Sequence, residues 1–108
     1  MLLQHTVRDQ AEQRPSAVAI ALNRETITYQ DLEESGNRLA RLLKAAGCEK
    51  GDRVGLLLPK SIRALIAMLG TLKAECIYVP LDTASPAIRL AKIIRVAEPK
   101  CILVVNST

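Results

Sequence analysis

Few side chains in this 108-residue sequence have the chemistry of a functional site, and most of them lie where apolar runs end. Lys60 and Ser61 follow the apolar residues 54–58, where an ammonium group and the first N–H groups of a helix could bind an anion. Asp82 follows the apolar residues 76–79, at the end of a strand where open parallel sheets bind ligands. Both positions also suit ordinary structural roles. We favour Ser61 as a helix N-cap and Asp82 as the anchor of the next loop.

The remaining titratable side chains do not form a recognisable catalytic or metal-binding pattern. Asp31, Glu33 and Glu34 are close in sequence, but acids in the first turn of a helix are stabilised by its dipole and are normally solvated. His5 is the single histidine and has no partner residue near it in sequence, so we expect it to be exposed. We therefore assign no catalytic, cofactor-binding or metal-binding residue to this chain.

The three cysteines also lack metal-site spacing. Cys48, Cys76 and Cys101 are separated by 28 and 25 positions, with no CxxC pair. Cys76 and Cys101 stand in apolar runs and are predicted to be core residues, whereas Cys48 is predicted to be a surface thiol beside a turn. An odd number of cysteines without a leader peptide favours a reducing, cytoplasmic location.

Composition and charge exclude several classes of protein. Hydrophobic residues make up 49% of the chain, enough for one folded domain with an aliphatic core, since Phe and Trp are absent. The net charge is +4, but the basic residues are scattered, which argues against nucleic-acid binding. No apolar run is long enough to cross a bilayer, and residues 1–10 lack the pattern of a secretory leader. We predict no nucleic-acid or membrane partner. The basic residues expected on solvent-facing helix surfaces are Arg41, Lys44, Arg63, Lys73, Arg89, Lys92 and Arg95.

The first half of the chain predicts a helix, a hairpin and a longer helix. Thr6 with Asp9 is an acidic form of a capping pair, which predicts a short helix over residues 7–13. Residues 17–22 and 26–28 predict strands joined by a turn at 23–25. A second capping pair, Thr28 with Asp31, opens an amphipathic helix, and Gly47 is placed to end it in a left-handed turn. Its apolar stripe is Leu32, Gly36, Leu39, Leu43 and Ala46.

From residue 54 onward the pattern alternates strand and helix. Strands are predicted at 54–58, 76–79 and 101–105, separated by helices that follow Ser61 and the pair Ser85-Pro86, with Pro86 at the first helical position. Such alternation predicts an α/β fold with parallel-sheet layers and flanking helices, connected by right-handed crossovers. The apolar helix faces that should cover the sheet are Ile62, Leu65, Ile66, Leu69, Leu72 and Leu90, Ile93, Ile94, Ala97.

Two motifs resemble those of one enzyme family. Residues 27–32 (ITYQDL) and, far more specifically, 72–82 (LKAECIYVPLD) are similar to the first two core motifs of the adenylate-forming enzymes. This superfamily includes amino-acid adenylation domains of nonribosomal peptide synthetases and acyl-CoA synthetases. Further matching segments occur in the family's order: GDRV at 51–54, LLLPKS at 56–61, SPAIRL at 85–90 and AEP at 97–99. The family usually has glycine where this chain has Glu75, which puts a charged side chain at a turn that favours a left-handed backbone.

The resemblance implies that residues 1–108 form an incomplete part of the large N-terminal subdomain of an AMP-binding (adenylation) domain. The full enzyme would use ATP and Mg to convert a carboxylic or amino acid to an acyl-adenylate, and would transfer the acyl group to the phosphopantetheine of a carrier protein or to coenzyme A. The details of YVPLD and SPAIRL favour the carrier-protein branch mildly. The phosphate-binding loop and the catalytic lysine of the family are expected beyond Thr108, so this chain alone should bind no cofactor and be inactive.

Two other functions remain open from the sequence. The chain could be a non-enzymatic interaction module that keeps the fold and pairs with a partner, or, less readily, an independent nucleotide-binding domain, for which a glycine-rich first turn is missing. Under the scaffold and module interpretations alike, an open sheet edge and an uncovered apolar face predict self-association or binding to the rest of an adenylation domain.

Overall fold

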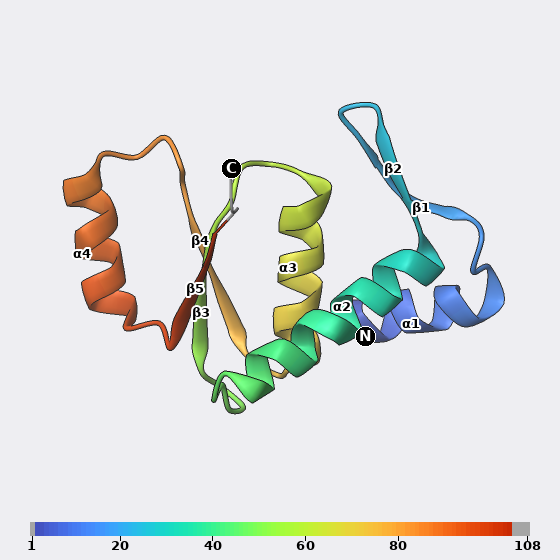
Figure 1. Cartoon of the computed structure of the whole chain (residues 1–108), viewed down its shortest axis with the longest axis horizontal. Helices are drawn as coiled ribbons and strands as arrows, with labels where there is room; N and C mark the ends of the chain where they lie inside the picture. Colours follow the sequence, from blue (N-terminus) through green and yellow to red (C-terminus); the bar gives the residue numbers. More distant parts are fainter. Residues whose placement is uncertain (1, 105–108) are drawn as a thin grey trace.

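A computed structural model describes residues 2–104, in which four helices and five strands follow one another along the chain. The elements are α1 (Leu3–Gln13), β1 (Val18–Leu22), β2 (Glu25–Thr28), α2 (Tyr29–Ala45), β3 (Arg53–Leu57), α3 (Ile62–Lys73), β4 (Ile77–Leu81), α4 (Ala87–Ala97) and β5 (Cys101–Val104). The last three strands form one sheet, with α3 and α2 on one side and α4 on the other, and the β1–β2 hairpin lies at the amino-terminal end of α2 (Figure 1).

The main sheet is parallel, as the alternation of strands and helices predicts. Its strand order is β4-β3-β5, so β3 is central and both β4 and β5 have one unpaired edge among the described residues. The register pairs Val54 with Tyr78 on one side and with Cys101 on the other. Pro80 lies within β4, which is permitted because β4 is an edge strand. The predicted α/β class is confirmed, with strand ends shifted by one or two residues; the prediction for residue 105 lies outside the described residues.

The hairpin and the start of α2 follow from local sequence. Asn23 and Arg24 both adopt positive φ, of 53° and 67°, which is the backbone of a tight two-residue hairpin turn. Thr28 then caps α2, its Oγ1 accepting the N–H of Asp31 at 3.2 Å. Gly47, with φ of 97°, turns the chain out of the helix in the left-handed conformation that was predicted.

Two helix boundaries differ from the predictions. Helix α1 begins at Leu3, so Thr6 is inside the helix and its hydroxyl donates to the carbonyl of Leu2 at 3.4 Å instead of capping. This start is supported by the N–H groups of His5 and Thr6, which both donate to that same carbonyl. Pro86 is the extended N-cap residue of α4, which begins one residue later, and Ser85 makes no side-chain cap.

The core lies between the sheet and the layer formed by α2 and α3. Val54 is fully buried there, together with Leu56, Leu43, Ala67 and Cys76. The two helices approach closely because each presents a glycine at the crossing. A Cβ at Gly70 would lie 2.8 Å from the Cβ of Leu39, and one at Gly36 would lie 3.0 Å from Leu69. These small residues allow α2 to lie directly on α3 (Figure 1).

The opposite face of the sheet is apolar and poorly covered. Helix α4 is on this side but contains no buried residue, and its inward residues Leu90, Ile93, Ile94 and Ala97 are only half-buried. Its C-terminal end is fixed to the sheet, where Arg53 donates to the carbonyl of Ala97 at 3.2 Å. We call the exposed apolar side chains of the sheet on this side the open face: Ile77, Ile102 and Val104. Ile88 and Val96 of α4 are also exposed, but they lie outside the inward-facing stripe of that helix. None of the helices described is long and apolar enough to span a membrane.

Candidate functional site

The loop that follows β3 contains the first candidate anion site, and its polar groups are used within the loop. The hydroxyl of Ser61 accepts the N–H of Ala64 at 3.1 Å and donates to the carbonyl of Pro59 at 2.9 Å. Ser61 is therefore the N-cap of α3, as predicted, while Lys60 beside it is exposed. The local geometry is that of a capped helix start.

The loop that follows β4 is organised by Asp82. Its Oδ1 accepts the N–H of Ala84 at 2.9 Å, and its carbonyl accepts the N–H of Ser85 at 3.0 Å. This pair of bonds folds the exposed loop into a turn and sets the direction in which the chain enters α4. The loop-anchoring role predicted for Asp82 is thus what the structure shows.

The cavities at this end of the sheet are apolar. One, of about 170 Å³, lies between α3 and β4 and is lined by Leu56, Leu58, Ala64, Met68, Tyr78, Pro80 and Leu81. A second, of about 260 Å³, is lined by Leu39, Leu58, Arg63, Ile66, Ala67, Leu103 and Val104. A phosphate cradle needs successive backbone N–H groups and positive charge. The walls of these cavities are instead mostly apolar, so they suit the packing of further apolar side chains.

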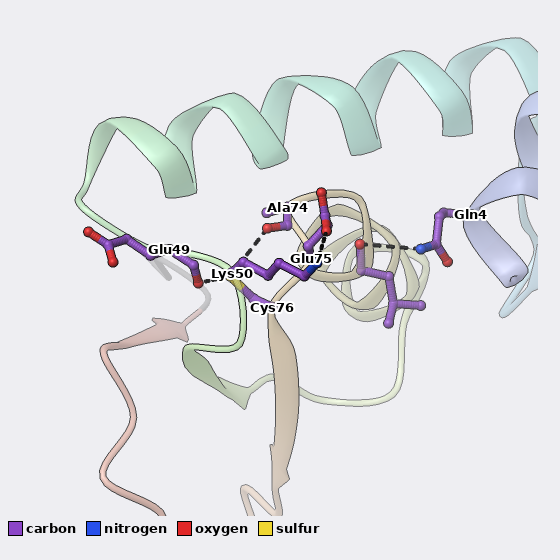
Figure 2. A network of polar contacts seen from close by, with 7 residues as sticks. Gln4, Glu49, Lys50, Ala74, Glu75 and Cys76 are labelled. Carbon is purple, nitrogen blue, oxygen red and sulfur yellow. Dashed lines mark hydrogen bonds and ion pairs between the residues drawn. The ribbon is translucent and has the colours of Figure 1, made fainter.

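Glu75 takes the left-handed backbone for which the family usually has glycine. Its φ is 61°, its N–H donates to the carbonyl of Leu72, and its own carbonyl accepts the N–H of Gly51 at 2.9 Å. Figure 2 shows its carboxylate paired with Lys50 on the neighbouring turn, at 3.4 Å and largely exposed. Glu75 therefore adopts the left-handed turn, and its carboxylate reaches Lys50 on the α2–β3 connection.

Glu33 and Lys73 form an ion pair that the sequence does not predict. Lys73 Nζ lies 2.7 Å from Glu33 Oε1, and the two side chains are only 11% and 15% exposed. The expectation that both are solvated is wrong. Gly36 lies on the buried side of α2, three positions after Glu33. Because glycine has no side chain, the aliphatic part of Lys73 can pack against it and bring the ammonium group to Glu33. The spacing of Glu33 and Gly36 is the sequence feature that could have indicated this pair. Asp31 and Glu34 are exposed as predicted, so no carboxylate cluster forms.

The three cysteines come together at the amino ends of the strands, opposite the loops of Ser61 and Asp82. Cys48 is buried, with 5% exposure, which corrects its prediction as a surface thiol; the chain turns back after Gly47, and the N–H of Cys48 donates to Leu43. Its Sγ lies 3.6 Å from that of Cys101. Burial is the main cause that raises the pKa of Cys101 to about 11 and also raises the pKa of Cys76.

No metal centre is present among residues 2–104, where no group of three or more His, Cys, Asp or Glu side chains could hold an ion. His5 is exposed, as predicted, and lies beside a polar groove of about 520 Å³ on the surface between α1, α2 and the end of α3. Gln4 spans part of this groove by donating to the carbonyl of Leu72 at 3.4 Å (Figure 2).

The described residues form a parallel α/β layer in which the side chains of Ser61 and Asp82 stabilise the loops that follow β3 and β4. The chain belongs to the family described as AMP-binding enzymes, which matches residues 7–108. It has the architecture of the N-terminal subdomain of adenylate-forming enzymes, and the resemblance carried by residues 27–32 and 72–82 is confirmed.

Similar proteins include a nonribosomal peptide synthetase and a fatty acid AMP ligase. Malpibaldin synthetase of Mortierella alpina is 41% identical over 90 residues, covering 83% of this chain and 2% of the synthetase. A four-domain nonribosomal peptide synthetase bound to AMP and glycine gives a TM-score of 0.90 at 36% identity, covering 98% and 8% of the two chains. A fatty acid AMP ligase from Legionella pneumophila gives 0.89 at 32%, covering 95% and 19%. The chain thus spans a small part of the proteins it matches.

Proposed function

We propose that this chain is the first structural layer of an enzyme that activates a carboxylic or amino acid with ATP. The enzyme would form an acyl-adenylate, release pyrophosphate, and pass the acyl group to a thiol of a carrier protein or of coenzyme A in the cytoplasm. The observation that carries the proposal is the family match over residues 7–108, together with similar proteins that are named as nonribosomal peptide synthetases. Peptide synthetases among the relatives favour an amino acid and a carrier protein.

Within that enzyme, residues 2–104 act as a scaffold. The side chains of Ser61 and Asp82 are engaged by their own loops, and the neighbouring cavities are apolar. The described residues therefore do not fit a triphosphate, and we derive no ATP or Mg contact from them. ATP binding would belong to segments outside this layer, mounted on the carboxyl ends of its strands, and the chain alone would be inactive.

The open face supports this role. Three apolar side chains on β4 and β5 are between 37% and 60% exposed on the side of the sheet that α4 covers incompletely. Contiguous apolar surface of this kind marks a site of association. We infer that the remainder of the adenylation domain packs against the open face, and that the isolated chain self-associates through it.

Acid-dependent exchange of pyrophosphate into ATP tests the proposal. The purified chain, the separately expressed remainder of a related adenylation domain, and an equimolar mixture of the two are assayed with a panel of amino and carboxylic acids. We expect exchange in the mixture alone. Exchange by the 108-residue chain by itself would contradict the scaffold role, and a stable complex without exchange would favour a non-enzymatic interaction module.

A further inference from the structure

The fold brings together two thiols that are far apart in sequence. Cys48 follows α2 and Cys101 is the first residue of β5, 53 positions later, yet their Sγ atoms are 3.6 Å apart. The third thiol, Cys76, is directed elsewhere, because its Sγ donates to the carbonyl of Glu49 at 3.3 Å (Figure 2). All three cysteines are free thiols. The arrangement singles out one pair from the three that the sequence allows.

We propose that Cys48 and Cys101 are a disulfide-forming pair that is oxidised by a small-molecule disulfide of the glutathione class. A disulfide has an S–S distance of about 2.05 Å, so the two sulfur atoms must approach by about 1.5 Å. Side-chain rotation can supply part of this movement, since Cys101 is only half-buried at the beginning of an edge strand. This site does not depend on the proposed enzymatic function.

The two steps of the exchange follow from the difference in exposure. The thiolate of Cys101, the more accessible sulfur, attacks oxidised glutathione, forms a mixed disulfide and releases one glutathione thiolate, which takes up a proton. The thiolate of Cys48 then attacks the Sγ of Cys101 and releases the second glutathione. Two protein thiols lose two electrons and two protons, and one glutathione disulfide becomes two thiols. Burial keeps the pKa of Cys101 near 11, which makes the reaction slow at neutral pH.

The bond would join the α2–β3 connection to β5, at the amino ends of the strands, whereas the loops of Ser61 and Asp82 lie at the carboxyl ends. It would restrain β5, one of the strands that carry the open face, without touching a residue of either loop. Oxidation should therefore raise the midpoint of urea unfolding. A disulfide between residues 53 positions apart closes a long loop and removes much conformational freedom from the unfolded chain, and this raises the free energy of unfolding.

Mass spectrometry tests the pairing on the purified full chain. The folded protein is incubated with oxidised glutathione, its free thiols are alkylated, and trypsin is added; the three cysteines fall in separate peptides, 45–50, 74–89 and 101–108. We expect loss of two hydrogens, a cross-link between peptides 45–50 and 101–108, and an alkylated Cys76. The variant Cys48→Ala should retain glutathione on Cys101, whereas Cys76→Ala should behave as the wild-type chain.

Oxidation in urea provides the matched control. In the unfolded chain, shorter loops close more readily, so the pairs of Cys76 with Cys48 and with Cys101 should each form about two- to three-fold more often than the longer pair. A folded chain that bridges Cys76, that keeps glutathione on wild-type Cys101 without closing, or that cross-links only to a second chain would overturn the proposal. Peptide mapping of the wild-type chain distinguishes these outcomes even if a variant unfolds.

Discussion

At the scale of single residues, Glu75 is the position where local sequence and backbone disagree most. A left-handed φ of 61° brings the Cβ of any L-residue close to the following carbonyl, at a cost of about 1–2 kcal/mol that glycine avoids. The ion pair with Lys50 contributes little to stability, because the side chains of Glu75 and Lys50 are 62% and 83% exposed to solvent. The turn is maintained by the backbone bonds to Leu72 and Gly51.

Replacing this residue by glycine should therefore stabilise the chain. We expect Glu75→Gly to raise the free energy of unfolding by about 1 kcal/mol, measured by urea denaturation. Glu75→Ala retains the Cβ and loses the ion pair, so it should change stability by less than about 0.5 kcal/mol. A destabilised glycine variant would mean that the carboxylate, not the backbone, holds the two connections together.

The thiol of Cys101 makes stability depend on pH in the alkaline range. Burial, followed by the hydrogen bond with Cys48, holds the pKa of Cys101 at about 11, above its ordinary value of 9.0. The folded chain keeps this proton while the unfolded chain releases it, so the contribution is fully present below pH 9 and is lost between pH 9 and 11. Denaturation in reductant should show a stability that falls over this range, and a shallower fall for Cys101→Ala. Equal slopes would contradict the assignment.

Residues whose role is set by their immediate neighbours could be predicted from the sequence. Thr28, Ser61 and Asp82 bind N–H groups two or three positions away, and all three were assigned correctly. Cys48 and Glu33 were not, since their burial depends on segments more than 35 positions away in the chain. The hydropathy of a single residue does not indicate whether a distant segment of the chain packs against it.

At the scale of elements, the crossing of α2 on α3 holds the helical layer together. The helices meet where Gly70 faces Leu39, and a methyl group at residue 70 would overlap the Leu39 side chain at 2.8–2.9 Å. Apolar periodicity predicted both helices, because it reflects burial on one side, and the alternation of strands and helices predicted that the strands are parallel. They could not predict how closely the helices approach, which depends on the facing pair.

The glycine at this crossing gives a prediction that changes sign with its neighbour. Gly70→Ala should lower the free energy of unfolding by about 1 kcal/mol, because overpacking outweighs the better helix propensity of alanine. In a Leu39→Gly background, which removes the Cβ of residue 39 together with the rest of its side chain, the same change should raise stability by about 0.5–1 kcal/mol. Urea denaturation of the four chains measures this coupling; additive effects would show that the two residues do not meet.

At the scale of the whole molecule, the two sides of the sheet are unequal. The α2–α3 side buries Val54 and Leu56 almost completely, whereas the side of α4 leaves Ile77 51% exposed and Val104 60% exposed. An uncovered side of this size is what we expect where the remainder of a larger domain packs. The sequence predicted that one apolar face is uncovered but not which one, because a strand that is apolar on both faces does not indicate which face the neighbouring helices cover.

The most direct test of the central claim is acid-dependent pyrophosphate exchange in the mixture with a related remainder, comparing two charged substitutions. Val104→Glu changes a side chain of the open face that is 60% exposed, and Leu42→Glu is a control of similar exposure, at 65%, on α2 across the sheet. We predict that Leu42→Glu supports exchange as the wild-type chain does and that Val104→Glu lowers it at least tenfold, about 1.4 kcal/mol of lost association. Exchange unaffected by Val104→Glu, or exchange by the chain alone, would contradict the account.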